Sequence, residues 1–416
     1  MGLQLCQLCE IAYFVTDKIP LEKVLLTDYV TTDSLLPNKE GRCVAQNLPP
    51  QKCALTHYKC GDVLVANIRP YLKKIWFADR EGGASADVLV FRAKSGHSQE
   101  FLYASLLQDS FYDYVMKGKK GSKMPRGDKA QIMRYSIPKL SLAEEACIGN
   151  MILSFCTKVN VNRLINDNLE AMAKQLYDYW FVQFDFPNEE GKPYKSSGGA
   201  MVWNEKLKRE IPVGWSVKNL GQIATSYQQG LIRSNNQLST DSKYGYLKMG
   251  DLDGKGQYTL QGLTRTNATN EEVDLYSLHK GDFLINVRNS KEIVGKTCLI
   301  GYVERNTLYN HMLVRLDFKD VSTFYMNLLF NSEFMYKALD GLKQGTTTVI
   351  ALYQSDLYRL PILIPAPCVM ERFLKITDSI LDQKEIISHE IAELTKQRNE
   401  LLPLLMNGQA TVNYHL

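Results

Sequence analysis

The chain of 416 residues has a formal net charge of +4, with 45% hydrophobic and 23% charged residues, an ordinary composition for a globular protein of two or three domains. No apolar run approaches the length of a membrane-spanning helix and no signal-peptide pattern opens the sequence, so we expect a cytoplasmic protein without a membrane partner. The nine cysteines are irregularly spaced and include a single Cys-x-x-Cys pair, Cys6 and Cys9, which disfavours a zinc ribbon and indicates reduced thiols.

The positive charge is concentrated in two blocks of the chain. Residues 1–140 contain 20 Lys and Arg against 14 Asp and Glu, and residues 211–365 contain 16 against 14. The segment after each block has a small negative balance. Two basic modules joined by acidic connectors favour a polyanionic partner.

Short motifs recur in the same order in the two halves of the chain. QLCEIA at 7–12 matches NLGQIA at 219–224, CGDVLVANIR at 60–69 resembles KGDFLINVR at 280–288, and SIPKLSLAEE at 136–145 corresponds to LIPAPCVMER at 363–372. The offset in numbering between the two copies drifts only slightly along these matches. We therefore predict two copies of one unit of roughly 200 residues, the size of a domain.

Each copy begins with short β-rich runs such as VLVANI and FLINV, mixed with turns and with a helical run at 100–116, and ends in a long amphipathic helix. This order predicts an α+β fold with two tandem, pseudo-twofold domains separated by two long antiparallel coiled-coil helices. The predicted segments are 1–140 for the first domain, 141–184 for the first helix, 185–211 for a linker, 212–366 for the second domain, 367–408 for the second helix and 409–416 for a tail.

Apolar residues in the two helical segments step by alternating four and three positions, which is the heptad pattern of a coiled-coil seam. Asn162 and Asn166 interrupt the first seam where the second seam has Ile387 and Ile391, and polar residues at such positions typically fix register. Stripes of this length need burial, so we predict that the helices pack antiparallel over about 60 Å. The predicted seam residues are Ile148, Ile152, Phe155, Val159, Leu169, Leu176, Ile380, Ile387, Ile391, Leu394, Leu401 and Leu405.

The segment between Trp180 and Trp215 is polar and rich in Gly, Pro and Ser. Asp185, Glu190 and Lys192 superficially resemble the set of a metal-dependent nuclease, but such sites draw their carboxylates from two strands and these lie in one loop containing proline. The run from Lys195 lacks the spacing and ending of a phosphate-binding loop. We interpret the segment as a linker.

The run FDFPNEEGKPYKSSGGAMVWNEKLKREIPVGW at 184–215 closely resembles the central region of specificity subunits from type I restriction–modification systems. GSKMPRGDKAQIMRYSIP at 121–138, GTTTVIALYQSDLYRLPILIP at 345–365 and LLPLLMNG at 401–408 are similar to that family as well. The resemblance implies two target-recognition domains for a bipartite DNA site, separated by two spacer helices. It also implies two modification subunits that bring S-adenosylmethionine and methylate adenine, and restriction subunits that use ATP and magnesium.

Motifs for catalysis are missing from the sequence. Asn47-Leu48-Pro49-Pro50 is the nearest approach to the adenine-methyltransferase motif, and its inserted Leu and missing aromatic residue spoil it. The six histidines form no metal-binding pattern, and neither a nucleophile elbow nor a Walker loop is present. We expect a non-catalytic chain that binds no metal or cofactor itself.

Two loops of the first domain are candidate contacts for double-stranded DNA, although a solvated charged loop is the alternative interpretation of the basic run. One is the basic run KGKKGSKMPRGDK at 117–129, and the other follows the Gly-Asp strand. The candidate residues are Arg69, Tyr71, Lys73, Lys74, Lys117, Lys119, Lys120, Lys123, Arg126 and Lys129.

The second domain has fewer charges and more amides in its candidate DNA loops. Asn and Gln suit adenine and Arg suits guanine, but the pattern does not assign residues to bases. The candidate residues are Gln228, Gln229, Arg233, Asn235, Arg288, Asn289, Lys291, Lys343, Gln344, Thr346, Thr347 and Thr348.

Aromatic residues near the end of the first helix are candidates for docking a partner subunit, with Trp180 favoured instead as a residue that packs on the seam. They are Tyr177, Tyr179, Trp180 and Phe181. Two other hypotheses stay open at this point. One is a coiled-coil adaptor that binds proteins and no DNA, which leaves the basic blocks unexplained, and the other is a self-sufficient DNA methyltransferase, which needs the motifs that are missing.

Overall fold

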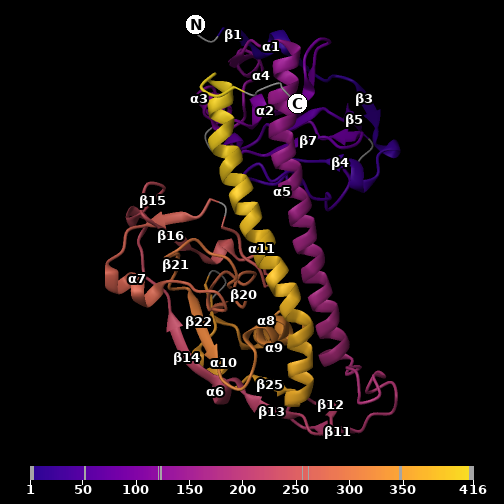
Figure 1. Cartoon of the computed structure of the whole chain (residues 1–416), viewed down its shortest axis with the longest axis vertical. Helices are drawn as coiled ribbons and strands as arrows, with labels where there is room; N and C mark the ends of the chain where they lie inside the picture. Colours follow the sequence, from indigo (N-terminus) through magenta and orange to yellow (C-terminus); the bar gives the residue numbers. More distant parts are fainter. Residues whose placement is uncertain are drawn as a thin grey trace. The chain divides into compact units, whose positions relative to one another are not determined.

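A computed structural model describes residues 4–50, 53–119, 121, 124–254, 256–260, 262–345 and 349–411 (Figure 1). The chain divides into two compact units, Met1–Ile165 with Glu390–Leu416, and Asn166–His389. We call them unit 1 and unit 2. Each unit contains one β-rich domain and a part of both long helices, which confirms the predicted α+β class.

Unit 1 is built on two four-stranded sheets. The first sheet has the order β2-β9-β6-β7, with strands Ala12–Phe14, Val88–Ala93, Val63–Ala66 and Ile75–Phe77. The second has the order β3-β5-β8-β4, with strands Lys18–Pro20, Ala54–Tyr58, Gly82–Ala84 and Tyr29–Val30. β1 (Leu5–Gln7) pairs with β10 (Ser136–Pro138). The helices of this domain are α1 (Leu8–Ile11), α2 (Gln99–Leu107), α3 (Asp109–Lys117) and α4 (Lys129–Ile132).

The helical run expected at 100–116 is two helices. Gln108 adopts extended backbone angles between α2 and α3, and the polar pair Asp109 and Ser110 begins the new helix. An Asp in the first turn is favoured by the helix dipole and competes with helix continuation, which explains the break.

Unit 2 repeats this plan. Its first sheet has the order β14-β22-β18-β20, with strands Ala224–Gln229, Leu313–Phe318, Phe283–Asn286 and Thr297–Leu299. Its second sheet has the order β15-β17-β16-β21, with strands Leu238–Ser239, Thr264–Thr266, Tyr244–Leu247 and Leu308–Tyr309. β13 (Ser216–Asn219) pairs with β25 (Pro361–Ile364). The helices are α6 (Leu220–Ile223), α7 (Asn270–Tyr276), α8 (Thr323–Phe330), α9 (Glu333–Leu342) and α10 (Gln354–Leu357).

Strand pairing supports the internal repeat and refines its alignment. Gln7 pairs with Ser136 in unit 1, and Asn219 pairs with Pro361 in unit 2, so Ser136 is equivalent to Pro361. The Ile-Pro match in the sequence instead places Ser136 opposite Leu363, two residues beyond Pro361. The long helices begin at Leu142 and Pro367, at the same interval as Ser136 and Pro361. The copies differ in the strand order of the second sheet. In unit 1 β8 lies between β5 and β4, whereas in unit 2 β16 lies between β17 and β21.

The recurring Gly-Asp motif holds a turn in front of a central strand. In unit 1 the Asp62 carboxylate accepts hydrogen bonds from Arg92 Nε (2.7 Å), from Arg92 Nη2 (2.6 Å) and from the Lys59 amide (2.7 Å). In unit 2 Asp282 receives Arg315 Nη1 at 3.2 Å and the amide of His279 at 2.9 Å. The glycines before the two aspartates have φ of +88° and +93°, which favours Gly at these positions. The motif is therefore a structural tie between two strands.

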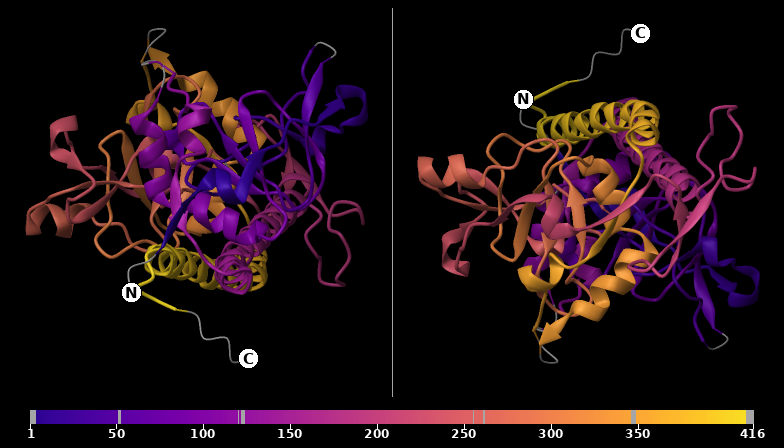
Figure 2. Two further views of the ribbon diagram at one scale, coloured as in Figure 1. Left: turned by 90° about the horizontal axis from the view of Figure 1, so that it is seen from above. Right: turned by 90° about the horizontal axis from the view of Figure 1, so that it is seen from below.

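Two long helices complete the fold, α5 (Leu142–Tyr177, 36 residues) and α11 (Pro367–Met406, 40 residues). In unit 1 the Asn162 amide donates to Glu390 Oε2 (2.8 Å), and Arg398 approaches Cys156. In unit 2 Asn166 donates to Ser388 Oγ (3.2 Å) and Lys384 pairs with Glu170. Residue numbers rise on one helix as they fall on the other, so within each unit the helices pack antiparallel, as predicted. Figure 2 shows both helices foreshortened, with α11 in yellow and α5 in magenta.

All twelve predicted seam residues are buried or half-buried in the structure. Ile148 and Ile152 join Leu402 and Leu405 in the core of unit 1. Leu169 and Ile380 belong to the core of unit 2. Phe155, Leu176, Ile387, Ile391, Leu394 and Leu401 are half-buried, and Val159 is buried.

The segment expected to be a plain linker contributes to the core of unit 2. A π-helical turn, Asp178–Val182, extends α5, and Phe186 stacks on Trp215 with ring centroids 5.2 Å apart. Asp185 receives the amide (2.7 Å) and hydroxyl (2.6 Å) of Ser196, which lowers its pKa and gives it a structural role. β11 (Met201–Asn204) and β12 (Arg209–Pro212) then form a hairpin.

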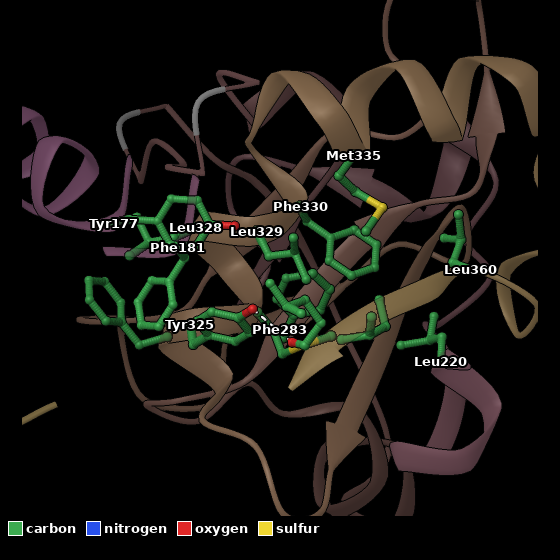
Figure 3. Packing of buried hydrophobic residues seen from close by; sticks show 14 of the residues in the cluster. Tyr177, Phe181, Leu220, Phe283, Tyr325, Leu328, Leu329, Phe330, Met335 and Leu360 are labelled. Carbon is green, nitrogen blue, oxygen red and sulfur yellow. Dashed lines mark hydrogen bonds between the residues drawn. The ribbon is translucent and has the colours of Figure 1, made fainter. Parts of the chain in front are cut away.

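The docking interpretation of Tyr177 and Phe181 is wrong, because both side chains are buried. They pack with Tyr325 and the helices of the second domain, and the Tyr325 hydroxyl donates to the Leu363 carbonyl at 2.8 Å (Figure 3). Trp180 packs 5.7 Å from Phe373, as favoured from the sequence, and Tyr179 remains exposed.

All nine cysteine thiols are free. Among the described residues, none of the helices combines the length and apolar character needed to cross a bilayer.

Removing the Asp62 carboxylate should destabilise the first domain strongly. The Asp62 side chain is 1% exposed, so Asp62→Ala leaves the Arg92 guanidinium without its main partner and should lower the free energy of unfolding by about 3–5 kcal/mol. Asp79→Ala is the matched control, because Asp79 pairs with Arg80 at the surface and should cost less than about 1 kcal/mol. Chemical denaturation measures both. Equal losses in the two variants would contradict a structural role for the tie.

Candidate nucleic-acid interface

The two candidate loops of the first domain meet at one edge of its first sheet. β2 and β6 both run antiparallel to β9, so both strands finish at the same end of the sheet. The chain leaving β6 forms a bridge between Ile68 and Arg126, and the Arg69 amide donates to the Pro125 carbonyl at 2.8 Å. The loop after the Gly-Asp strand and the described part of the basic loop are thereby joined into one surface, which we call loop cluster 1 (residues 67–74, 117–119, 121 and 124–129).

Six of the ten candidate side chains of the first domain are exposed, namely Arg69, Tyr71, Lys117, Lys119, Arg126 and Lys129. Arg126 also lies 3.2 Å from the exposed Asp87. Lys73 Nζ is 2.7 Å from Asp109, and Lys74 Nζ donates to the Thr32 carbonyl at 2.6 Å, so these two cations have partners within the protein. Lys120 and Lys123 lie outside the described residues.

The second domain repeats this junction. β14 and β18 both run antiparallel to β22, and Gln229 and Asn286 lie opposite the neighbouring residues Val314 and Leu313. The chain leaving β18 forms β19 (Arg288–Asn289), which pairs with β24 (Ile350–Ala351), and β24 pairs with β23 (Gln344–Gly345). Two of the candidate loops are therefore joined as well, and the third begins at the same end of the sheet; we call the three loop cluster 2 (residues 228–237, 287–291, 343–345 and 349–351).

Loop cluster 2 contains both exposed and internally bonded candidates. Arg233 forms an ion pair with Glu272 at 2.6 Å and its side chain is only 9% exposed. Gln228 donates to the Leu275 carbonyl and accepts from Arg315, while Lys343 contacts Asp340 and the Lys291 carbonyl. Gln229, Asn235, Arg288, Lys291 and Gln344 are exposed, and Asn289 is half-buried. Thr346, Thr347 and Thr348 lie outside the described residues.

Strand register corrects one equivalence drawn from the sequence. Val65 pairs with Leu89, and Ile285 pairs with Val314, so Val65 and Ile285 occupy the same place in the central strand of the two copies. Counting onward from these two residues makes Arg288 equivalent to Ile68, and Arg69 equivalent to Asn289. The two domains present different chemistry from the same backbone position.

His311 lies beside loop cluster 2, and the sequence patterns missed it. Its amide donates to the Leu231 carbonyl at 3.1 Å, and burial together with the nearby Arg288 lowers the pKa of its imidazole. The ring is therefore largely neutral at pH 7 and can offer both a donor and an acceptor. A lone histidine carries no sequence signal for such a place, because the packing of two distant loops creates it.

The described part of the chain holds no group of three or more His, Cys, Asp and Glu side chains arranged for a metal ion. Asp185 and Glu190, which superficially suggested a nuclease, are used differently. Asp185 is bonded to Ser196, while Glu190 pairs at the surface with Lys192.

Residues 212–396 match the protein-family model described as "Type I restriction modification DNA specificity domain". This range covers the second domain and much of α11. The first domain lies outside the match.

Two curated proteins and one solved structure extend the similarity. The chain is 24% identical over 330 residues to the type I restriction enzyme MjaIX specificity subunit of Methanocaldococcus jannaschii, covering 77% of this chain and 71% of that protein. It is 23% identical to the HindI specificity subunit of Haemophilus influenzae, covering 92% and 94%. The S subunit structure from M. genitalium has the same fold, with a TM-score of 0.53, 12% identity, and coverage of 98% and 96%.

Replacing two lysines of loop cluster 1 should weaken DNA binding in a salt-dependent way. Lys117 and Lys119 are exposed near the end of α3, so Lys117→Ala with Lys119→Ala should make the slope of log K against log salt less steep by about 0.9 for each phosphate that is no longer bound. Fluorescence anisotropy on a duplex at several salt concentrations measures the slope. The control pair Lys206→Ala with Lys208→Ala, in the turn of the β11–β12 hairpin, should leave it unchanged. An equal change in both pairs would argue against a specific face.

Proposed function

Because the chain belongs to the DNA specificity subunits of type I restriction–modification systems, we propose that each of its two β-rich domains binds one half of a bipartite DNA target. The specificity subunit is the non-catalytic component of such an enzyme. The chemistry in this proposal is performed by other subunits, and this chain selects where on the DNA it occurs.

The repeated loop junction is the observation that carries the proposal. The same two loops, one after the Gly-Asp strand and one before the closing strand, are joined in both domains, by the Ile68–Arg126 bridge and by the β19–β24 pairing. Two related sites that bind different half-sites need the same backbone scaffold with different exposed loop residues. The two domains have this combination. An adaptor that bound only proteins would have no need of two polar loop clusters.

The two clusters suit different parts of DNA recognition. Loop cluster 1 exposes Arg69, Lys117, Lys119 and Arg126, which favours phosphate contacts and affinity. Loop cluster 2 exposes Gln229 and Asn235 with Arg288, and these side chains can make paired hydrogen bonds with adenine and guanine edges in the major groove. Gln344 is exposed as well, but its amide donates to Asp356 Oδ2 at 2.9 Å. The internally bonded Arg233 and Lys343 act in this proposal as supports for their loops.

We further propose that the long helices set the gap between the half-sites. Helices of 36 and 40 residues are about 54 and 60 Å long, which corresponds to roughly one and a half to one and three quarter turns of duplex. The polar contacts inside the seam, Asn162 with Glu390 and Asn166 with Ser388, favour one antiparallel register. A fixed register gives the pair α5 and α11 a fixed length, and a defined gap between half-sites requires such a length.

The partners in this proposal are two modification subunits and, in the larger complex, restriction subunits. The modification subunits would supply S-adenosylmethionine and methylate adenine, and the restriction subunits would use ATP and magnesium. On α5, Val161, Leu164 and Ile165 form an apolar patch within unit 1, and Leu164 is 62% exposed. Such a patch on a coiled-coil helix suits a partner helix better than water.

The deciding experiment maps methylated adenines by single-molecule sequencing in cells that contain this chain and its modification partner, with and without the chain. We expect one bipartite motif to lose methylation when the chain is deleted. Unchanged methylation in cells whose modification subunit is shown to be active would contradict the specificity role and favour the adaptor. Methyl transfer by the purified chain alone would favour a self-sufficient methyltransferase.

Changing one domain should alter one half-site. Arg288→Ala removes an exposed guanidinium from loop cluster 2, and the loss of one paired contact to a base is worth about 1–3 kcal/mol of discrimination. We expect the methylated motif to become degenerate in one half while the other half and the gap stay unchanged. Loss of selectivity in both halves would show that the two domains do not act independently.

A further inference from the structure

Backbone strain is concentrated in two turns of the first domain. Of the eight non-glycine residues with positive φ in the described part of the chain, four lie here: Asn38 (+56°), Lys39 (+65°), Arg69 (+53°) and Lys73 (+51°). L-residues rarely adopt this left-handed conformation, which persists where the surrounding structure holds it in place and which gathers at functional sites. A turn after a buried strand could be built without such strain, so its presence calls for a cause.

Hydrogen bonds hold the two turns against each other and against the basic loop. The Asn38 amide donates to the Leu72 carbonyl and the Lys39 amide to the Lys73 carbonyl, each at 2.9 Å. On the other side, the Arg69 amide donates to the Pro125 carbonyl at 2.8 Å. The segment from Arg69 to Lys73 is therefore fixed at both ends.

Asp109, at the start of α3, fastens the same segment through its carboxylate. Lys39 Nζ lies 2.9 Å and Lys73 Nζ 2.7 Å from Asp109 Oδ1, and the Lys39 side chain is only 8% exposed. Burial opposes ionisation of Asp109, but the hydrogen bonds from the two lysines outweigh it and lower the pKa of the carboxyl. The charged tie is therefore intact at neutral pH and is lost when the carboxyl is protonated in acid.

The fixed segment displays one aromatic side chain. Pro70, Tyr71 and Leu72 form a 3₁₀ turn in which Pro70 is buried and Tyr71 is 51% exposed. The exposed guanidinium groups of Arg69 and Arg126 belong to the same loop cluster. This turn is rigid, with an aromatic residue at its centre and cations beside it, so it loses little conformational entropy when a ligand binds.

We propose that Tyr71 is a specificity-determining residue of the first domain, whose ring contacts bases while Arg69 and Arg126 pair with phosphates. The inference rests on the proposed function and assigns roles within it. Phosphates attract cations whatever the sequence, whereas a phenol ring makes apolar and hydrogen-bonding contacts that depend on the base. Asp109 is then a positioning residue, because it holds the turn without reaching the ligand.

Methylation mapping in cells with the full chain and its modification partner tests this assignment. We expect Tyr71→Ala to make one half-site degenerate, with discrimination reduced about tenfold or more at one or two positions, because no ring then touches the bases. Tyr71→Phe should keep most of the selectivity. Arg126→Ala should instead lower methylation at every site without changing the motif. Leu25→Ala is the control, since Leu25 is an exposed side chain of the same domain outside loop cluster 1 and should change nothing.

The positioning role of Asp109 has its own readout. Asp109→Asn should reduce selectivity in the same half-site as Tyr71→Ala, and the double variant should be no worse than Tyr71→Ala alone, because both changes act through one ring. Further loss of selectivity in the double variant would overturn the positioning role. Circular dichroism of the purified variants checks that each is folded, and Tyr71→Gln provides a second replacement.

Two outcomes would overturn the role of Tyr71. One is an unchanged motif with Tyr71→Ala and with Tyr71→Gln, and the other is a uniform fall in methylation with the motif preserved, which would make Tyr71 an affinity residue. Failure of the proposed function is a separate result, because it appears as a methylation pattern that does not depend on the wild-type chain at all.

Discussion

Burial of the apolar seam between α5 and α11 is the constraint on which each unit depends. Neither helix is apolar all round, and amphipathic helices of this length gain most of their stability from packing of their apolar face. In unit 1, Ile148 and Ile152 pack with Leu402 and Leu405 in the same core as the helices of the first domain. In unit 2, Leu169 and Trp180 share a core with Phe373 and the second domain. The seam and the domain cores are therefore continuous within each unit.

A second constraint fixes the end of each first sheet that lies opposite the loop clusters. The Gly-Asp turn binds an arginine on the neighbouring strand, Arg92 in unit 1 and Arg315 in unit 2. The Gly-Asp turn recurs, but its arginine comes from different positions of the neighbouring strand, because strand register makes Arg315 equivalent to Val90 and Arg92 equivalent to Asp317. The loops at the far end of the same strands vary. A fold with a repeated frame and variable loops can change its DNA target without losing stability.

Much of the positive charge in the loop clusters supports the protein itself. Lys73, Lys74, Arg233 and Lys343 are bonded within the chain, whereas Arg69, Lys117 and Arg288 are exposed. A basic sequence run therefore overstates the number of cations available to DNA. The internally bonded ones have another role, since they hold the exposed side chains in fixed positions and lower the entropy lost on binding.

Sequence periodicity by itself determined the α+β class, the tandem repeat and the antiparallel seam, because heptads and recurring motifs are local patterns that survive without knowledge of contacts. The tertiary structure alone decided which loops meet, that the segment around Phe186 and Trp215 belongs to a core, and that Tyr177 and Phe181 are buried. It also showed that Arg288 is equivalent to Ile68, and that Asp109 and Lys39 hold the turn that displays Tyr71. These facts depend on strand register and on contacts between residues far apart in the chain, and no local pattern encodes them.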